Sequence, residues 1–339
     1  MFGRMMNRYY YGKSGKGDYT PEDLPENRWQ LFWDVLRTRF ASLFKLNLMY
    51  MVVWIPAMVV ITLGLLNVYQ LMINLSDAMD AAAAADATAE ALQALSDAQA
   101  TLSDSLISYI GQTLILLIPC ITLTGPATAG LCYVTRNWAR DEHAFIWADF
   151  KENAKANWKQ GLLTSFLTGL LYALLFICVV FYSRMTATMG AMMIIPEVIC
   201  VLAGILWSGV LIYIYPQMVT YELRYKDLLR NSLLLALGNL PMTALGRVLS
   251  LLPAVILVLV SLFTPYAIYA VMIYGLYYIL LGFALSRFVS ASITNAAFDK
   301  TLNTRIPGAQ VGRGLRKEED DEDEEEEEEV KSIAESTEE

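Results

Sequence analysis

The chain has 339 residues, of which 56% are hydrophobic and only 17% are charged. This composition excludes an ordinary soluble domain and is typical of a polytopic membrane protein. The formal charge of −9 is a poor guide to partners, because residues 318–339 carry 15 acids and one Lys, whereas residues 1–317 carry 24 basic and 19 acidic residues, or +5.

Residues 1–26 are rich in Gly, Lys, Tyr and Pro, and we expect them to form a mobile cytoplasmic N-terminus. Gly12-Lys13-Ser14 is similar to the end of a phosphate-binding loop, but Asn7 stands where that pattern needs its first glycine. No nucleotide or other cofactor is therefore predicted.

An apolar stripe at helical spacing follows, with Pro25 suited to a first helical turn. Its members are Trp29, Phe32, Leu36, Phe40 and Leu43. Two placements of this helix fit the pattern: along the inner membrane interface, or packed on the spans as an ordinary cytoplasmic helix.

Six apolar segments are long enough to cross a membrane, for which about 20 residues suffice. They are residues 46–73, 106–134, 161–183, 192–216, 248–263 and 266–286. The last two form one apolar run, which we divide at Thr264-Pro265 because proline removes a backbone donor and restricts the preceding residue.

The basic residues give these spans an orientation. The segments 1–45, 135–160, 219–247 and 287–339 hold 8, 5, 4 and 7 Lys and Arg residues, and only Arg184 lies on the other side. Because Lys and Arg beside spans resist translocation, both termini are predicted to be cytoplasmic in a bacterial cell membrane.

Residues 74–105 are the one substantial outer segment, with six acids, no Lys or Arg, and a run of alanines. Alanine is the best helix former, so we expect the first two spans to continue outward as a helical hairpin that turns between Asp86 and Asp97. A flexible low-complexity connection is the alternative.

Three cytoplasmic segments share an acid about ten residues before the next span: Asp34, Asp149 and Asp227. The predicted fold is therefore an all-α membrane bundle of six spans, arranged as three loose repeats of a cytoplasmic elbow helix and two spans within residues 27–298. Residues 299–339 are predicted to be a disordered acidic tail, either a solubilising end or a segment that docks on a basic partner.

Residues typical of catalysis are scarce. The single histidine, His143, has no histidine partner at metal-ligand spacing, and no nucleophile or nucleotide motif is present. No catalytic, cofactor or metal site is therefore predicted, and the protein is not expected to be an enzyme. Arg184 and Glu197, on either side of the short outer connection between the third and fourth spans, are expected to pair.

Two blocks carry a family resemblance. Thr124-Gly125-Pro126-Ala127-Thr128-Ala129-Gly130, with Arg136 and Ala148-Asp149-Phe150, resembles the signature of the YesL-like bacterial membrane proteins, a domain of unknown function. The second block runs from Tyr215-Pro216 to Asn231-Ser232, and the resemblance covers roughly residues 29–298.

The motif residues have physical expectations. We expect Gly125-Pro126 and Tyr215-Pro216 to interrupt helices at their inner ends, with Thr128 compensating freed carbonyls. Arg136 is expected to meet lipid phosphates or acids of a neighbour, and Asp149 to cap an elbow helix. These residues and Asn231 form the predicted interface.

The resemblance implies association with sugar importers of the ABC class. We therefore expect a non-catalytic accessory or assembly subunit, whose partners are the lipid bilayer and importer permease subunits rather than nucleic acid. A stand-alone small transporter or channel, and a membrane-bound regulator, are the alternatives. The solute and the oligomeric state stay open.

Overall fold

A computed structural model describes residues 24–84 and 88–316, without the side chains of residues 82, 84 and 91. The described parts are helices and loops with no strand. The long helices are α2 (Arg28–Ala84), α3 (Ala89–Trp138), α5 (Trp158–Met189), α6 (Ile194–Met218), α8 (Leu240–Phe263) and α10 (Phe283–Thr301). The short ones are α4 (Ile146–Ala156), α7 (Tyr225–Gly238), α9 (Ala267–Tyr277), the 3-10 turns η2 (Ala191–Met193) and η4 (Asn303–Arg305), and the π-helical turn η3 (Tyr278–Gly282).

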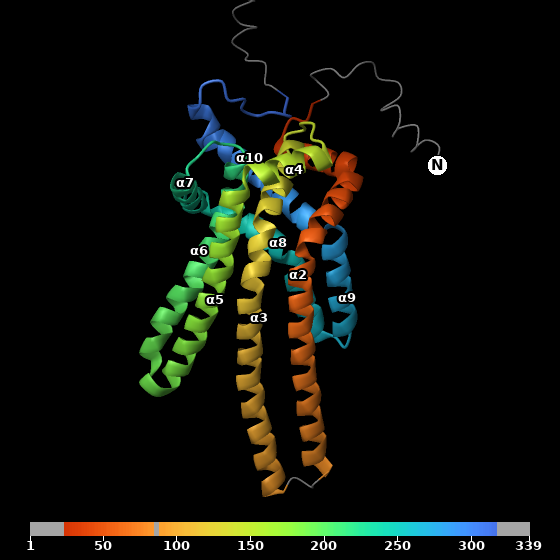
Figure 1. Cartoon of the computed structure of the whole chain (residues 1–339), viewed down its shortest axis with the longest axis vertical. Coiled ribbons are helices and arrows are strands. Elements are labelled where there is room, and N and C mark those ends of the chain that lie inside the picture. Colours follow the sequence, from red (N-terminus) through yellow and green to blue (C-terminus); the bar gives the residue numbers. More distant parts are fainter. Residues whose placement is uncertain (1–23, 85–87, 317–339) are drawn as a thin grey trace, which may run out of the picture.

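Six helical segments of the described chain are long and apolar enough to cross a membrane, which confirms the predicted all-α polytopic bundle. Figure 1 shows α2 and α3 side by side, with α5–α6 and α8–α9 as shorter hairpins beside them. The elbow helices α4 and α7 lie at the opposite end of the molecule from the α2–α3 turn.

The long apolar run near the C-terminus is divided as predicted. Helix α8 ends at Phe263, and Thr264 is extended with φ −138° and ψ 155°. The returning helix is less regular than expected, because α9 passes into the π-helical turn η3 before α10 begins. Helix α10 then continues to Thr301, well past the predicted end of the sixth span at residue 286.

Two elbows are separate helices joined to the next span by one asparagine. Asn157 links α4 to α5 with φ −101° and ψ 17°, and Asn239 links α7 to α8 with φ −116° and ψ 43°. Each elbow also begins after an extended residue, Phe145 or Arg224. The first elbow differs, because residues 28–45 run without interruption into α2.

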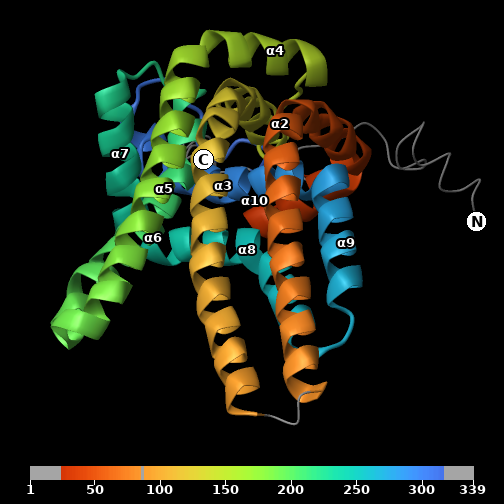
Figure 2. The ribbon, with the colours of Figure 1, turned by 60° about the horizontal axis from the view of Figure 1, so that its bottom comes forward.

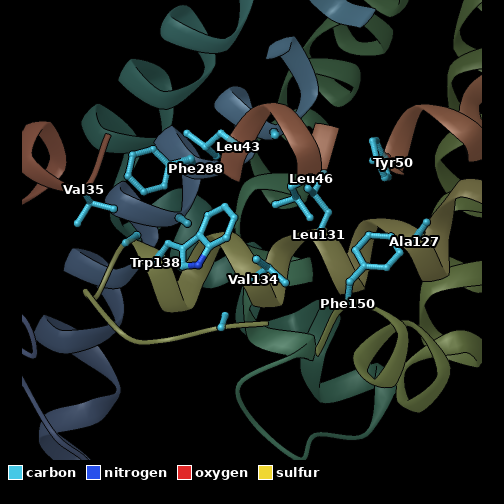
Figure 3. Packing of buried hydrophobic residues seen from close by; sticks show 14 of the residues in the cluster. Val35, Leu43, Leu46, Tyr50, Ala127, Leu131, Val134, Trp138, Phe150 and Phe288 are labelled. Carbon is cyan, nitrogen blue, oxygen red and sulfur yellow. The ribbon is translucent and has the colours of Figure 1, made fainter. Parts of the chain in front are cut away.

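The main core lies where the inner halves of α2, α3 and α10 meet (Figure 3). Leu43 and Leu46 of α2, Leu131 and Val134 of α3, and Phe288 of α10 are all fully buried. By contrast, the outer halves of α2 and α3 expose many large apolar side chains, as expected of surfaces that face lipid. Tight packing is therefore concentrated at the inner end.

The outer segment is helical almost to its turn. Helix α2 ends at Ala84 and α3 begins at Ala89, so the chain reverses at the start of the range expected from the sequence. In both Figure 1 and Figure 2 this hairpin extends beyond the ends of the other helices. Residue 86, one of its six acids, lies outside the described residues.

The end of the described chain packs back onto the inner surface. Residues 306–316, the C-terminal strap, follow η4 and reach the start of α2, where Arg316 N donates to Pro25 O at 2.9 Å. The boundary drawn at residue 298 from the sequence thus falls inside α10, and residues 299–316 belong with the bundle. The predicted mobile N-terminus, except residues 24–26, and the predicted disordered acidic tail from residue 317 onward lie outside the described residues.

Candidate functional site at the inner end of the bundle

Glycines of the predicted motif bring helices into backbone contact. A Cβ on Gly125 would lie 2.1 Å from Gly161 O, and a Cβ on Gly130 would lie 2.4 Å from Phe150 O. Only hydrogen fits at either position, so α3 can approach both α5 and the elbow α4. Phe150 itself is buried in the main core. The glycines of the motif therefore allow α3, α4 and α5 to pack closely together.

The two prolines do not interrupt their helices. Helix α3 continues through Pro126 to Trp138, and α6 continues through the buried Pro216 to Met218, contrary to the expected breaks. Membrane helices tolerate proline where neighbouring helices and Ser or Thr side chains satisfy the backbone. Thr128 does not show the expected compensation, because its hydroxyl donates to Thr124 O at 2.9 Å and lies 2.7 Å from Tyr50 Oη, whereas the carbonyl that loses its helical donor at Pro126 is that of Thr122.

Asp149 caps the start of its elbow helix. Its Oδ2 accepts a hydrogen bond of 2.8 Å from Phe145 N, one of the backbone donors that a helix leaves free at its N-terminus.

Asn231 lies half-buried on α7, beside Ser232, whose hydroxyl accepts a hydrogen bond from Gln217 Nε2 at 3.2 Å.

Arg136 points into the bundle and not toward lipid phosphates. It is 9% exposed, its NH1 lies 3.3 Å from Asn137 Oδ1, and its Nε has no acceptor among the described residues. Helix α10 covers this part of α3, where Asn295 Nδ2 donates to Arg136 O at 3.4 Å. Packing of α10 on α3 is the reason that the sequence-based placement fails.

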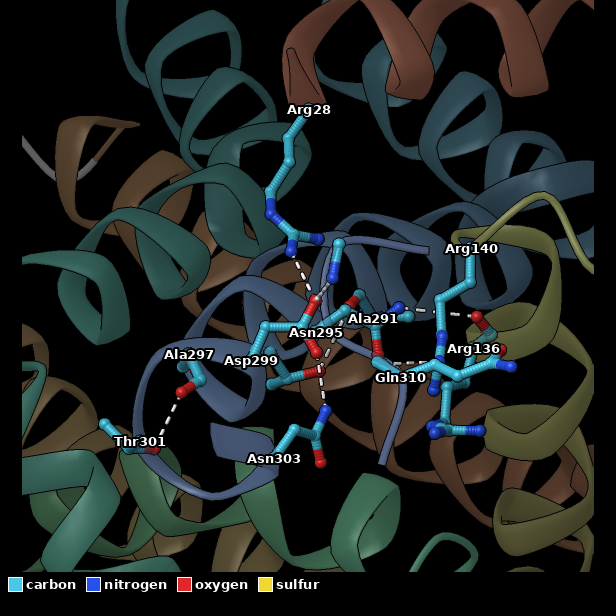
Figure 4. Close-up of polar contacts among 12 residues, drawn as sticks. Arg28, Arg136, Arg140, Ala291, Asn295, Ala297, Asp299, Thr301, Asn303 and Gln310 are labelled. Atoms are coloured by element: carbon cyan, nitrogen blue, oxygen red, sulfur yellow. Dashed lines mark hydrogen bonds and ion pairs between the residues drawn. The ribbon is translucent and has the colours of Figure 1, made fainter. Parts of the chain in front are cut away.

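Asp299, which the sequence analysis did not single out, connects the two ends of the described chain (Figure 4). Asp299 Oδ2 lies 2.5 Å from Arg28 NH2 and accepts from Gly312 N at 3.0 Å, while Oδ1 accepts from Asn303 Nδ2 at 2.5 Å. Tyr221 Oη donates to Asn303 Oδ1 at 2.7 Å. Burial raises the pKa of the Tyr221 phenol, which keeps this donor protonated at neutral pH.

A second carboxylate secures the strap. Glu142 Oε1 lies 3.2 Å from Arg140 Nε and 3.2 Å from Arg313 Nε. Arg140 NH2 also donates to Gln310 O at 3.3 Å. The strap is therefore held by one ion pair and one hydrogen bond from the α3–α4 connection as well as by Asp299.

Arg287 lies among four helices and was counted from the sequence only as a cytoplasmic charge. Its guanidinium carbon is 5.3 Å from the centre of the Tyr215 ring, and its charge acts most on Cys132, Tyr50 and Tyr215. The thiol and the two phenols are neutral at neutral pH. No described carboxylate lies within ion-pairing distance of Arg287.

The contacts of Arg287 recover less free energy than it costs to bury its charge. A guanidinium over an aromatic ring gains about 2 kcal/mol when both are shielded from water, whereas the effective cost of moving an ion into a protein interior is several kcal/mol. A second arginine, Arg247 of α8, also lacks a carboxylate partner among the described residues, and it donates from Nε to Ser208 O at 2.7 Å.

Arg184 has a different partner from the one expected. Its NH2 lies 2.6 Å from Asp104 Oδ1 on α3, so the predicted pair with Glu197 is corrected. The outward extension of α3 beside α5 brings Asp104 to the end of the third span, while Glu197 lies in the first turn of α6 and forms no ion pair with any described residue.

Metal and disulfide chemistry have no visible support. The described residues contain no group of three or more His, Cys, Asp or Glu that is arranged to hold a metal. Cys120, Cys132, Cys178 and Cys200 are free thiols. His143 packs edge-on against Phe145, with 4.6 Å between ring centroids.

Comparison with known proteins bears on the first motif. Neither the curated proteins nor the solved structures give a match to this chain. A family model does match residues 106–179, which include Gly125, Arg136 and Phe150 but not the second block from Tyr215. The part of the chain that holds the Gly125–Gly161 contact is thus similar to the family described as "Protein of unknown function, DUF624".

Proposed function

We propose that this protein is a non-catalytic accessory or assembly subunit of a carbohydrate ABC importer in a bacterial cell membrane, with both termini cytoplasmic. The α2–α3 hairpin is the observation that supports this proposal most. It extends past the other helices in both views, and a segment with this reach is suited to contact another protein (Figures 1 and 2). The choice of partner rests on the family resemblance.

The hairpin surface is suited to a basic or mixed partner. Residues 74–105 have six acids and no Lys or Arg, and apolar side chains such as Met79 and Leu92 are more than half exposed. Exposed apolar groups among charges are typical of association surfaces. The described inner half, in contrast, is closed by its own packing and by the strap.

Co-purification tests the proposal. The full chain, carrying an affinity tag, is expected to recover permease and ATPase subunits from its native membrane in mild detergent. A variant with Asp77→Asn, Asp80→Asn and Asp97→Asn is expected to recover less, because it loses charge on the hairpin. A variant with Asp34→Asn, Glu222→Gln and Asp227→Asn, which changes inner acids, is the matched control. Recovery of no importer subunit at any expression level overturns the proposal.

A stand-alone transporter is the second candidate, and the uncompensated Arg287 is the observation that favours it. Liposomes that contain only this protein test it directly. Uptake of a labelled sugar or organic anion that disappears in Arg287→Gln liposomes, but persists in Arg184→Gln liposomes, favours transport over the accessory role.

A further inference from the structure

A spare hydroxyl donor lies beside Arg287 in the inner half of the bundle. Of the two hydroxyl hydrogens in the Ser165–Tyr215 pair, one fills their 2.7 Å contact and the other is free to donate elsewhere. The ring centre of Tyr215 is 5.3 Å from the Arg287 guanidinium carbon, and no described acid pairs with that cation.

Arg287 is only half-buried, so part of its surface stays open to a group from outside the described chain. Arg247 of α8 likewise has no carboxylate partner among the described residues, and its Nε donates to a neutral backbone carbonyl, Ser208 O.

We propose that Arg287, with Tyr215 and Ser165, forms a binding site for a phosphate group in the inner half of the bundle. A guanidinium pairs with phosphate oxygens in a two-bonded geometry, and neutral hydroxyl donors fit the remaining oxygens. Charged side chains within membrane bundles commonly mark ligand sites. The phosphate belongs either to a phospholipid head group or to a small soluble phosphate compound, since both present the same oxygens.

This site is independent of the proposed partner, because it involves neither the outer hairpin nor an importer subunit. Two binding experiments distinguish a small soluble phosphate compound from a phospholipid head group. In the soluble arm, equilibrium dialysis measures binding of radiolabelled inorganic phosphate to the delipidated full chain in neutral detergent. In the lipid arm, native mass spectrometry counts phosphatidylglycerol bound from mixed micelles, with a phosphate-free galactolipid as the control lipid.

The wild-type chain is expected to bind in at least one arm, and Arg287→Gln to weaken that binding at least about tenfold. Arg287→Lys is expected to keep part of the binding, because lysine has the positive charge but lacks the two parallel N–H donors of arginine. Arg184→Gln, the same substitution in an arginine outside the site, is the matched control and is expected to bind as wild type does.

Tyr215→Phe is a second test of the site, which stays informative if Arg287→Gln fails to fold. It keeps the ring under Arg287 but removes one hydroxyl, and it is expected to weaken binding by about threefold to tenfold. Binding in the lipid arm alone assigns a head group, and binding in the soluble arm alone assigns a small phosphate compound. Absence of binding in both arms, or equal binding by wild type, Arg287→Gln and Tyr215→Phe, overturns the site.

Discussion

Gly125 and Gly161 meet backbone to backbone, so that a Cβ on Gly125 would lie 2.1 Å from Gly161 O. The contact joins α3 to α5 at the inner end, where the core is most tightly packed. A distance this short leaves no room for a methyl group unless the helices separate.

Gly125→Ala is therefore expected to destabilise the protein by about 1–3 kcal/mol or more. Gly275→Ala is the control, because a Cβ on Gly275 meets no heavy atom within 4 Å. The control is expected to be neutral or slightly stabilising, since alanine favours helix. Thermal unfolding in detergent measures both, and equal melting temperatures would contradict the close contact.

Asn47 compensates the irregular turn before α10. Its Nδ2 donates to Tyr278 O at 2.9 Å and to Ile279 O at 2.7 Å, and its Oδ1 accepts from Ala284 N at 2.9 Å. Asn47→Ala removes three hydrogen bonds worth about 1 kcal/mol each, so a loss of about 3 kcal/mol is expected in the free energy of unfolding.

The control for this change is Asn67→Ala, at an exposed position on the same helix. It is expected to change stability little. If both variants unfold at the same temperature as wild type, Asn47 does not support the π-helical turn.

Asp299→Asn is expected to release the strap. The substitution removes the charge that Arg28 NH2 and Gly312 N contact, at a cost of about 2–3 kcal/mol for hydrogen bonds to a charged group. Limited proteolysis reads out the effect, because residues 306–316 become accessible. Asp227→Asn, at an exposed acid on α7, is the control. Unchanged cleavage in Asp299→Asn would show that other contacts hold the strap.

The pair of Arg184 with Asp104 is expected to contribute little. Their side chains are 57% and 75% exposed, and exposed pairs contribute at most about 1 kcal/mol. A double-mutant cycle with Arg184→Gln and Asp104→Asn is expected to give a small favourable coupling that salt removes. The cycle of Arg184→Gln with Glu197→Gln is expected to give none, and coupling there would restore the sequence-based pairing.

Asp141 introduces a pH dependence in the α3–α4 connection. Burial raises the pKa of its carboxyl, and the nearby Asp34 adds to this while Arg39 opposes it. The folded state therefore binds this proton more tightly than the unfolded chain, so the stability it contributes is full below the unfolded pKa of about 3.9 and is lost as pH rises through the folded pKa.

Asp141→Asn removes that dependence and keeps the local shape, since asparagine tolerates the φ of 54° found here. The stability of the variant relative to wild type is expected to increase as the pH is raised from about 4 to 7. Melting temperatures across this range measure the difference. A difference that is constant with pH would contradict the raised pKa of Asp141.

The sequence predicted the features that depend on local chemistry. Apolar length gives the six spans, and Thr264-Pro265 divides the last two because proline acts on its own neighbours. Asp149 could be recognised as a cap because its partner, Phe145 N, lies four residues away.

Long-range features could not be predicted in the same way. Arg28 and Asp299 are 271 positions apart in the sequence, and their pairing depends on how α10 lies across α3. Arg287 could not be told apart from the other cytoplasmic basic residues. A count of basic residues does not show which side of a helix faces the bundle interior. The effect of proline was overestimated at Pro126, since α3 continues through it to Trp138.

The hydrogen bond from Arg316 N to Pro25 O makes the described chain almost a closed ring. Two segments this close suit a circular permutation, because a short linker can join residue 316 to residue 25. New ends fit best between Ala84 of α2 and Ala89 of α3, at the far end of the molecule. The order of the helices along the gene is thus separable from their arrangement in the membrane.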